Sequence, residues 1–265
     1  MTGAVRTDDR PTVSVVIPVK DDDTELRRCL RALSLQSVAP DEVIVVDNGS
    51  SDSSVAVARE AGARVVRCER PGIPAASSAG YDAATGDLIL RLDADCLPAE
   101  TWVEKMVEAF ADRPDVAGFT GGARFITGPR VLRAPLAAVY LTAYALLTAP
   151  ALGHLPVFGS NLGLRRDAWR GIRSCVHRDD ADLHDDLDLA FHLGERHRIR
   201  FLRHAAMGMS MRPLTSTAGS GRRIALGFRT VLMHWPRDFP PVRWERLALR
   251  RLLDRAAPAL QQVAR

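Results

Sequence analysis

The sequence predicts an α/β fold in which a mostly parallel central sheet is flanked by helices. Short β-branched runs at 12–19, 43–46, 64–68 and 87–92 alternate with segments whose apolar residues recur at helical spacing, and this alternation is typical of parallel sheets covered by helices. Polar clusters directly follow the first, second and fourth of these runs. Ligands bind beyond the carboxyl ends of the strands in such sheets, so we expect the three clusters to converge on one crevice.

The predicted elements follow one another in short units. The run TVSVVIPV at 12–19 is too short for a helix and suits a buried parallel strand. Helices after the second and third strands are expected to end near residues 61 and 84, and Gly86 breaks the pattern before the fourth strand. A further helix and strand end the regular part of the chain, at about 100–110 and 116–120.

We expect a single domain over residues 12–252. A chain of 265 residues is long enough to bury one large core, and no internal repeat or clear linker divides the sequence. The regular alternation fills 12–122, while 123–252 is less regular and is expected to complete the same domain. Residues 1–11 and 253–265 are expected to be tails.

The composition is that of an ordinary soluble globular protein and excludes the fibrous and disordered classes. Hydrophobic residues make up 46% and charged residues 26%, with a formal net charge of +4. The excess arginine lies mainly in the last third of the chain, which is a skew rather than a nucleic-acid-binding arm, so we expect no nucleic acid partner. The cysteines lack a CxxC pair, and the N-terminus lacks the apolar core of a signal peptide, which favours a cytoplasmic location.

One uncharged segment, 134–153, has roughly the length that spans a bilayer. Pro135 and Pro150 interrupt it, and it is rich in alanine and threonine. We expect a buried or interfacial helix here. The alternative is peripheral contact with the inner face of a membrane or with a lipid, and neither interpretation requires a segment that crosses the membrane.

Asp93 and Asp95 flank Ala94 directly after the fourth predicted strand. Two carboxylates at positions i and i+2 of a strand tip can both reach one cation, and hard oxygen ligands suit Mg²⁺ or Mn²⁺. Such a metal would neutralise a leaving diphosphate. The alternative for an isolated DxD triplet is a solvated turn, but the place of this triplet between a buried strand and Pro98 favours metal binding.

Asp47 ends the second predicted strand, within VIVVDNGSSDSS. A carboxylate at this place can accept hydrogen bonds from a uracil N–H or a ribose hydroxyl. The alternative is capping of the following helix, which accounts for Ser50, Ser51 and Asp52. For Asp47 itself we favour ligand binding.

This ordered series of motifs resembles the family 2 glycosyltransferases, which have the fold known as GT-A. The resemblance spans roughly residues 12–210. It implies a nucleotide-sugar-binding half at 12–122, an acceptor half at 123–252, and inverting transfer of a sugar from a UDP- or GDP-sugar donor to a hydroxyl acceptor. The motifs that carry it are VSVVIPVKDDDTELRRCLRAL, VIVVDNGSSDSS, Gly72-Ile73-Pro74 through Gly80, GDLILRLDADCLP and HDDLDLAFHL.

The resemblance also implies roles for the residues at the strand ends. Asp47 would bind the base or the ribose, Asp93 the ribose and diphosphate, and Asp95 the divalent metal, Mn²⁺ or Mg²⁺. Ala94 lies between the two acids and would face the same nucleotide-sugar. The contacts to the nucleoside at the end of the first strand fall on Pro18, Val19 and Asp21.

The family's catalytic base lies in an acidic pair at the start of a helix on the acceptor side. The matching stretch here is HDDLDL, in which Asp186 takes the position of the base and Asp185 that of the usual glutamate. An aspartate there would accept a proton from the acceptor hydroxyl as that hydroxyl attacks the anomeric carbon. The alternative is a helix start whose acids stabilise the positive end of the helix dipole, and both roles can coexist.

The chain departs from the family at one charged contact. Many relatives continue with Arg-Asn after the segment that begins at Gly72, whereas Ser77 and Ser78 stand here. The candidates to supply a replacement cation are Arg70, Arg91, Arg222 and Arg223.

Arg222 and Arg223 follow a stretch at 215–221 that is rich in glycine, serine and threonine. This composition favours a mobile loop. The resemblance to the family implies that such a loop closes the two guanidinium groups over the diphosphate of the donor, where their geometry suits phosphate oxygens. The alternative is an ordinary basic helix start.

On the acceptor side, Ser160 and Asn161 resemble a loop of the family. Trp169 follows, and its indole either stacks on a sugar or packs in the core. The seven histidines are scattered along the chain. His192 and His197 do not have the spacing of a zinc pair on a helix, so we expect surface or core histidines rather than ligands.

Two other functions compete with sugar transfer. A sugar-phosphate nucleotidyltransferase would show a Gly-rich phosphate loop directly after its first strand, and Val19-Lys20-Asp21-Asp22 is not one. A catalytically inactive nucleotide-sugar-binding module is disfavoured because the acids at the strand ends occur together with Asp186. The acceptor stays open between a lipid carrier, a polysaccharide and a small metabolite.

Overall fold

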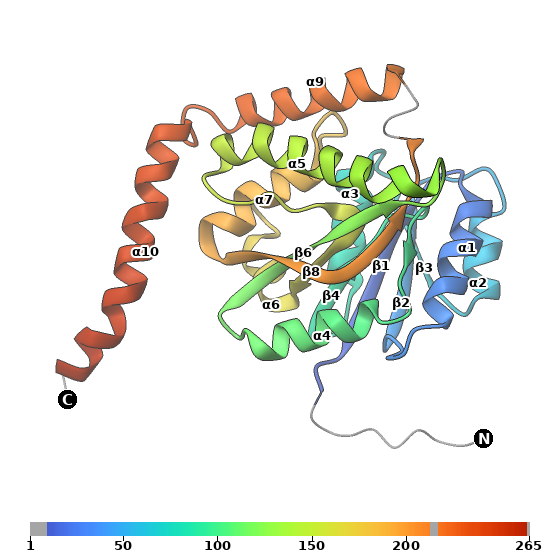
Figure 1. The fold of residues 1–265 in the computed structure, drawn as a ribbon, viewed down its shortest axis with the longest axis horizontal. Coiled ribbons are helices and arrows are strands. Elements are labelled where there is room, and N and C mark those ends of the chain that lie inside the picture. Colours follow the sequence, from blue (N-terminus) through green and yellow to red (C-terminus); the bar gives the residue numbers. More distant parts are fainter. Residues whose placement is uncertain (1–9, 213–216, 264–265) are drawn as a thin grey trace.

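The computed structural model describes residues 10–212 and 217–263 (Figure 1). Within the described residues one eight-stranded sheet has the order β3-β2-β1-β4-β7-β6-β8-β5. Its strands are β1 (Val13–Val19), β2 (Glu42–Asp47), β3 (Arg64–Arg67), β4 (Leu88–Arg91), β5 (Leu97–Pro98), β6 (Val116–Phe125), β7 (Leu162–Arg165) and β8 (Arg198–Met209).

Helices cover both faces of this sheet (Figure 1). They are α1 (Asp23–Ser34), α2 (Ser54–Glu60), α3 (Ile73–Ala83), α4 (Trp102–Asp112), α5 (Arg133–Leu152), α6 (Arg166–Ile172), α7 (Asp185–Arg196), α9 (Thr217–Met233) and α10 (Pro240–Val263), with the short 3-10 helices η1 (Arg130–Leu132) and η2 (Gly159–Asn161). The buried side chains of α1 and α4 pack on one face of the sheet, and those of α3, α6 and α7 pack on the other.

The strands of the first half are parallel, as the sequence predicts. β1 pairs in parallel with β2 and β4, and β2 pairs in parallel with β3. The second half adds antiparallel pairs, because β7 lies between β4 and β6 and runs against both of them. β6 and β8 are parallel again, and β5 is antiparallel to β8. The sheet is therefore mixed but mostly parallel, and it does not divide at residue 122.

The alternation of side chains along β4 positions the site. Successive residues of a strand face opposite sides of the sheet. Leu88 and Leu90 join the core that contains α1 and α4, whereas Ile89 joins the core that contains α3, α6 and α7. Arg91 comes two residues after Ile89 and therefore faces α7, with only 3% of its side chain exposed.

The second half differs from the prediction at its predicted loop and tail. Residues 217–221 belong to the first turns of α9 rather than to a mobile loop, while 215–216 lie outside the described residues. The predicted boundary after residue 252 falls inside α10, which continues as a helix to Val263. Of the predicted N-terminal tail, residues 1–9 lie outside the described part of the chain.

The uncharged segment forms α5, and Gly153 ends this helix with a φ of 72°, a conformation that favours glycine. Among the described residues, Arg130–Leu152 is long and apolar enough to cross a membrane by length and composition alone, with a mean hydropathy of 1.5, and only 17% of its apolar stretch is buried. Large apolar side chains on α5, including Leu146 and Leu147, are exposed.

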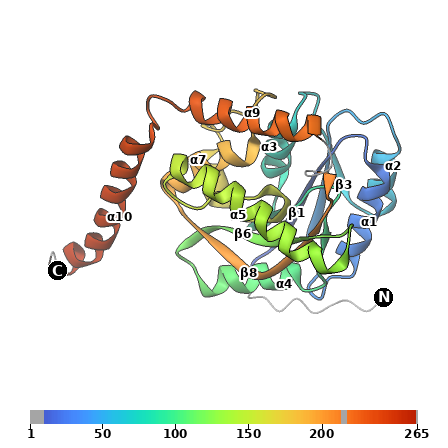
Figure 2. The same ribbon diagram turned by 45° about the horizontal axis from the view of Figure 1, so that its top comes forward.

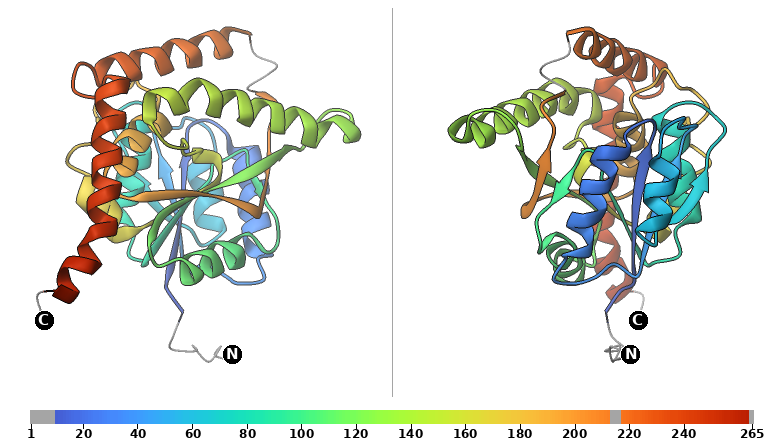
Figure 3. Two further views of the ribbon diagram at one scale, coloured as in Figure 1. Left: turned by 60° about the vertical axis from the view of Figure 1, so that its left-hand side comes forward. Right: turned by 90° about the vertical axis from the view of Figure 1, so that its right-hand side faces the viewer.

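The last two helices, α9 and α10, lie at the periphery of the molecule. α9 lies at the same end as α5 (Figure 2), and α10 extends along one side (Figure 3). Arg243, which is 0% exposed, anchors α10. Its guanidinium donates to the carbonyls of Leu152 at 2.6 Å and Phe191 at 2.8 Å and pairs with Asp238 at 2.9 Å. Arg243 thus ties α10 to the end of α5 and to α7.

Candidate active site

Hydrogen bonds join the loops that follow β1 and β2. Asp21 accepts from the backbone N–H and the hydroxyl of Ser51 at 2.7 and 2.9 Å, and these bonds lower the pKa of Asp21. Asp21 has a positive φ of 51°, which aspartate tolerates better than most residues. Asp47, only 7% exposed, accepts from the N–H of Ser50 at 2.9 Å. The two strand ends therefore lie together, as the sequence predicts.

Pro18 and Val19 lie within β1 and align the neighbouring strand. Val19 pairs with Asp47 in the parallel register, its side chain lies in the core, and its carbonyl accepts from the N–H of Asn48 at 2.9 Å. The contact between Val19 and a nucleoside therefore stays a prediction, and it could involve only the backbone of Val19, because the side chain lies in the core. Asn48, which the sequence did not single out, also accepts from the N–H of Gly72 at 2.9 Å.

Arg91 lies at the centre of the acidic residues. Its Nη2 donates to Oδ1 of Asp93 at 2.9 Å, and its Nη1 lies 3.0 Å from Oδ2 of Asp185 and hydrogen-bonds to Oδ1 of Asp186. Asp93 belongs to the DxD triplet after β4, and the other two aspartates belong to the first turn of α7. The structure therefore brings the triplet and the predicted base pair into one cluster.

This cluster carries more negative than positive charge, because one guanidinium faces three carboxylates. Next to it, the side chains of Asp93, Asp95 and Cys96 offer donor atoms within 4.8 Å of one another. Burial raises the pKa of the Cys96 thiol well above its usual range, which leaves the two carboxylates as the ligands. Carboxylate oxygens with excess negative charge fit a hard divalent cation such as Mg²⁺ or Mn²⁺.

Asp95 has the environment of a carboxylate that is suited to a cation. Burial and then the charge of Asp93 raise the pKa of Asp95 to about 6, although Arg212 lowers it. The guanidinium of Arg212 lies 4.0 Å from Asp95 and donates to both oxygens of Asp22 at 2.6 and 2.9 Å. Ala94, between the two acids, is buried. Asp95 remains our candidate for the principal metal ligand.

The two aspartates at the start of α7 differ in their surroundings. Both oxygens of Asp186 are engaged, Oδ1 by Arg91 and Oδ2 by the N–H of Gly159 at 2.8 Å. Arg91 contacts Asp185 at Oδ2, and the same oxygen accepts a hydrogen bond from the hydroxyl of Ser77 at 3.3 Å. Burial raises the pKa of Asp185 to about 6, against the effect of Arg91. Asp185 is therefore the better placed of the two to exchange a proton near neutral pH.

The 3-10 helix η2 packs directly onto this cluster. A Cβ atom on Gly159 would lie 1.8 Å from Nη1 of Arg91 and 2.1 Å from Oδ1 of Asp186, so glycine is required by the close approach. The hydroxyl of Ser160 hydrogen-bonds to Oδ2 of Asp93. Ser160 therefore lies in the site, beside the DxD triplet.

Asn161 and Trp169, by contrast, are internal. Asn161 is 0% exposed, accepts from the indole N–H of Trp102 at 2.8 Å, and donates to two backbone carbonyls. Trp169 is 1% exposed and donates to Asp82 at 2.9 Å. The acceptor-side roles predicted for both residues are contradicted, because the amide of Asn161 is fully engaged and the indole of Trp169 has no open face. For Trp169 the packing alternative holds.

Arg222 and Arg223 lie in the exposed first turns of α9. Arg222 is 3.6 Å from Asp182, and both side chains are mostly exposed. In the part of the chain that the structure describes, neither arginine contacts the DxD triplet, so their place over a diphosphate stays a prediction. The arginine that lies beside the triplet is Arg212.

Sequence reasoning missed the central role of Arg91 and named it only as one of several replacement cations. A signal was present, because a charged residue within the apolar run LILRL must be paired if the strand is buried. Arg212 carried no comparable signal. Its neighbours Asp22 and Asp95 are distant in the chain, and only the complete fold brings them together.

Comparison with known proteins now gives the family. The model for glycosyl transferase family 2 matches residues 14–169, and the chain therefore belongs to this family of glycosyltransferases.

Glycosyltransferase AglE of Haloferax volcanii is 33% identical over 109 residues, which is 38% of this chain and 36% of that protein. The undecaprenyl-phosphate 4-deoxy-4-formamido-L-arabinose transferase of Sodalis glossinidius is 36% identical over 116 residues, 40% of this chain and 36% of that protein. The chain thus spans little more than a third of the length of these relatives.

Solved structures confirm the predicted GT-A fold. Glucosyl-3-phosphoglycerate synthase from Mycobacterium tuberculosis, in complex with Mn²⁺, UDP-glucose and phosphoglyceric acid, matches with a TM-score of 0.58 and 24% identity over 84% of this chain and 80% of that one. Its complex with Mn²⁺, UDP-glucose and glycerol 3-phosphate matches with a TM-score of 0.60 and 22% identity over 85% and 80% of the two chains. At these identities the likeness establishes the fold alone.

Proposed function

We propose that the protein is an inverting, metal-dependent glycosyltransferase that moves a sugar from a UDP- or GDP-sugar donor to a hydroxyl acceptor. The observation that carries this proposal is the cluster in which Arg91 contacts Asp93 of the DxD triplet together with Asp185 and Asp186. The leaving diphosphate and the attacking hydroxyl must meet at one anomeric carbon. A site that holds metal ligands and a carboxylate base side by side serves both requirements.

The donor is proposed to lie along the carboxyl ends of β1, β2 and β4. Asp21 and Asp47 would face its nucleoside, and Asp93 and Asp95 would hold a divalent metal, which supplies charge neutralisation to the leaving diphosphate when bound. Arg212 adds a guanidinium 4.0 Å from Asp95, and this group suits phosphate oxygens. The Mn²⁺ and UDP-glucose found in a protein of the same fold support this donor class.

We assign the general base to Asp185 and give Asp186 a positioning role. The acceptor oxygen attacks the anomeric carbon, the bond from that carbon to the diphosphate oxygen breaks with its electron pair, and the hydroxyl proton passes to Asp185. This single displacement inverts the carbon. The sequence favours Asp186 as the base, but Arg91 and the N–H of Gly159 engage both of its oxygens. A base works best when its pKa lies near the working pH, which the raised pKa of Asp185 favours.

The acceptor is proposed to be carried by a lipid at the inner face of a membrane. Leu146 and Leu147 of α5 are 70 and 78% exposed. On the same helix, the ring of Tyr144 stacks on His184, at 5.7 Å between centroids, directly before Asp185. An exposed apolar helix that reaches the site suits a lipid-bound acceptor. The undecaprenyl-phosphate in the name of one relative supports the same class.

A transfer assay with the whole chain tests this function. Mn²⁺ and a panel of UDP- and GDP-sugars would be combined with lipid-carrier, polysaccharide and small-metabolite acceptors. We expect turnover of at least one donor with a lipid-carrier acceptor, and Asp185→Asn should lower kcat by about 10²–10⁴-fold. Asp167→Asn is the matched control, because the side chain of Asp167 is 92% exposed and distant from the site.

Two outcomes would change the proposal in different ways. Nucleotide-sugar binding without turnover over the whole panel would indicate a binding module rather than a transferase. A larger loss of kcat in Asp186→Asn than in Asp185→Asn, with both variants folded by circular dichroism, would return the base to Asp186.

A further inference from the structure

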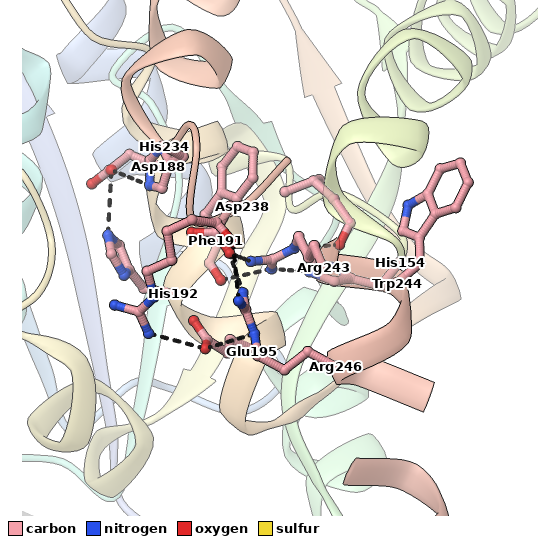
Figure 4. Close-up of polar contacts among 12 residues, drawn as sticks. His154, Asp188, Phe191, His192, Glu195, His234, Asp238, Arg243, Trp244 and Arg246 are labelled. Atoms are coloured by element: carbon pink, nitrogen blue, oxygen red, sulfur yellow. Dashed lines mark hydrogen bonds and ion pairs between the residues drawn. The ribbon is translucent and has the colours of Figure 1, made fainter. Parts of the chain in front are cut away.

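A second polar cluster surrounds Asp188 of α7. His177 comes from the loop between α6 and α7, His192 lies one turn after Asp188, and His234 directly follows α9. Figure 4 shows His192 and His234 pointing toward the carboxylate of Asp188. Nδ1 of His177 is 2.7 Å from Oδ1 of Asp188, and the Nε2 atoms of His234 and His192 are 3.3 and 3.5 Å from the same oxygen.

The three imidazole rings form a nearly equilateral triangle. The ring centroids of His177 and His192 are 5.4 Å apart, and each is 5.3 Å from the centroid of His234. Three imidazoles on a tetrahedral Zn²⁺ with bonds of about 2.0–2.1 Å would have centroids about 5 Å apart. One donor atom from each ring and one from Asp188 also lie within 4.8 Å of one another. Small side-chain movements would bring all four atoms to one ion.

The inward nitrogen of His234 lies within ion-pair distance of Asp188 but forms no hydrogen bond. Nδ1 lies 2.8 Å from the carbonyl oxygen of Thr230, to which it donates its hydrogen. If that ring carries no second hydrogen, its Nε2 presents a lone pair to the carboxylate of Asp188. Within the described residues, the Nε2 atoms of His192 and His234 are both buried without a hydrogen-bond partner. A lone pair beside a carboxylate is repulsive unless the ring is protonated or a cation lies between them.

We propose that His177, Asp188, His192 and His234 bind one Zn²⁺ ion. Three imidazole nitrogens and one carboxylate oxygen are a donor set that Zn²⁺ prefers. The DxD triplet, in contrast, offers only carboxylate oxygens beside a protonated thiol, which suits Mg²⁺ or Mn²⁺. The two sites are therefore distinguished by the metal that each selects.

The surroundings of the cluster already orient its ligands. The backbone N–H of His177 donates to Oδ2 of Asp188 at 2.9 Å, which directs Oδ1 toward the three rings. Phe191 stacks on His234 with centroids 4.0 Å apart, and the carbonyl of Thr230 fixes the tautomer of that ring. Supporting contacts of this kind are typical of metal-ligating histidines.

A Zn²⁺ ion here would connect the loop before α7, α7 itself and the segment after α9. Four protein ligands leave no open position, which is typical of a structural zinc. A surface cavity of about 350 Å³ that His177, His192 and His234 help to line gives the ion access. The ion would hold α7 one turn from Asp185, and the proposal does not depend on whether the chain transfers a sugar.

The test uses the whole chain without a histidine tag, stripped of metal and titrated with Co²⁺ and then Zn²⁺. Tetrahedral Co²⁺ absorbs visible light much more strongly than octahedral Co²⁺. We expect one equivalent of Co²⁺ with strong tetrahedral absorption that one equivalent of Zn²⁺ abolishes. His192→Gln and His234→Gln should weaken Zn²⁺ binding at least tenfold, whereas Asp95→Ala should leave it unchanged.

The matched control is His204→Gln, because His204 is an exposed histidine in β8 and its loss should not affect Zn²⁺ binding. Weak octahedral absorption of Co²⁺ in the wild-type chain would overturn the proposal without reference to any variant. Equal Zn²⁺ affinity in the wild type and in folded His234→Gln would overturn it as well. A cluster of protonated histidines without a metal would give this second result.

Discussion

The start of α7 supplies acids to two clusters of opposite composition. Asp185 and Asp186 face Arg91, so that carboxylates outnumber the single guanidinium. Asp188, at most one turn further on, faces three imidazoles and is 1% exposed. In the first cluster, positive charge beyond that of Arg91 would come from a bound divalent metal. In the second cluster, nitrogen donors surround one carboxylate.

The comparison shows how one helix start serves two purposes. Each of these acids lies in the first turn and can stabilise the positive end of the helix dipole. The pattern HDDLDL therefore does not distinguish Asp185 and Asp186 from Asp188. What separates them is the strand or helix that each side chain meets. Arg91 contacts Asp185 and Asp186 from β4. His177 contacts Asp188 from the loop before α7, and His234 does so from the segment after α9.

The largest expected effect comes from removing the cation of the first cluster. Arg91→Met should lower the free energy of unfolding by about 3–5 kcal/mol at neutral pH, because it leaves buried carboxylates without their partner. Urea unfolding followed by circular dichroism measures this change. The loss should be smaller below about pH 6, where the carboxyl of Asp185, whose pKa burial raises to about 6, becomes protonated.

Arg28→Met is the control for this prediction. Arg28 pairs with Glu25 at 3.1 Å, and its side chain is 62% exposed, so the variant should cost less than about 1 kcal/mol. Equal costs for the buried and the exposed arginine would contradict the account of the first cluster.

Gly159→Ala should be next in size. The new Cβ would overlap Nη1 of Arg91 and Oδ1 of Asp186, and overpacking of this kind costs about 1–3 kcal/mol. Because the overlap falls on the acid cluster, kcat should fall together with stability. Gly171→Ala is the control, since a Cβ there would meet nothing within 4 Å. Unchanged stability and kcat in Gly159→Ala would show that η2 does not pack as described.

The pH profile should show the raised pKa of Asp185. The base acts when it is deprotonated, so kcat/KM should fall about tenfold for each unit as the pH drops below about 6. The stability effect has the opposite sign, because a carboxyl whose pKa is raised by folding favours the folded state at low pH and loses that contribution as the pH rises through about 6. Asp185→Asn should weaken both trends without abolishing them, because burial also raises the pKa of Asp95 to about 6. A wild-type profile that is flat from pH 4 to 7 would count against this base.

Trp169→Phe should have the smallest effect. The change removes the indole donor to Asp82 at 2.9 Å and should cost about 1 kcal/mol in unfolding free energy. KM and kcat should stay within twofold of the wild type, because the ring is internal. A marked rise in the KM for the acceptor would restore the sugar-stacking role that the structure contradicts.

Local pattern was enough to predict the first half of the fold and its strand-end acids. β1, β2 and β4 are apolar runs whose partners follow from the alternation of strand and helix. Asp47 ends one such run, and Asp93 directly follows another. Their position at the same edge of the sheet could therefore be expected from sequence alone. The start of α7 at Asp185 was visible as well, from its acids and apolar positions.

The remaining features depend on contacts between distant segments. Asn161 and Trp169 match acceptor-side positions of the family, but β6 and α3 bury them. The spacing of Asp188 and His192, four residues apart in one helix, could have suggested a ligand pair. The two other histidines of that cluster come from a loop and from the end of α9, and no periodicity in the sequence links them to α7.

The central claim is that the DxD triplet holds a metal that binds the donor diphosphate. Calorimetry of UDP and GDP binding, with and without Mn²⁺, tests it most directly in the wild type and in Asp95→Ala. We predict that Mn²⁺ tightens binding of one nucleotide to the wild type by at least tenfold, about 1.4 kcal/mol, and that Asp95→Ala loses this effect. The same Mn²⁺-dependent tightening in Asp95→Ala, or no nucleotide binding by the wild type, would contradict the account.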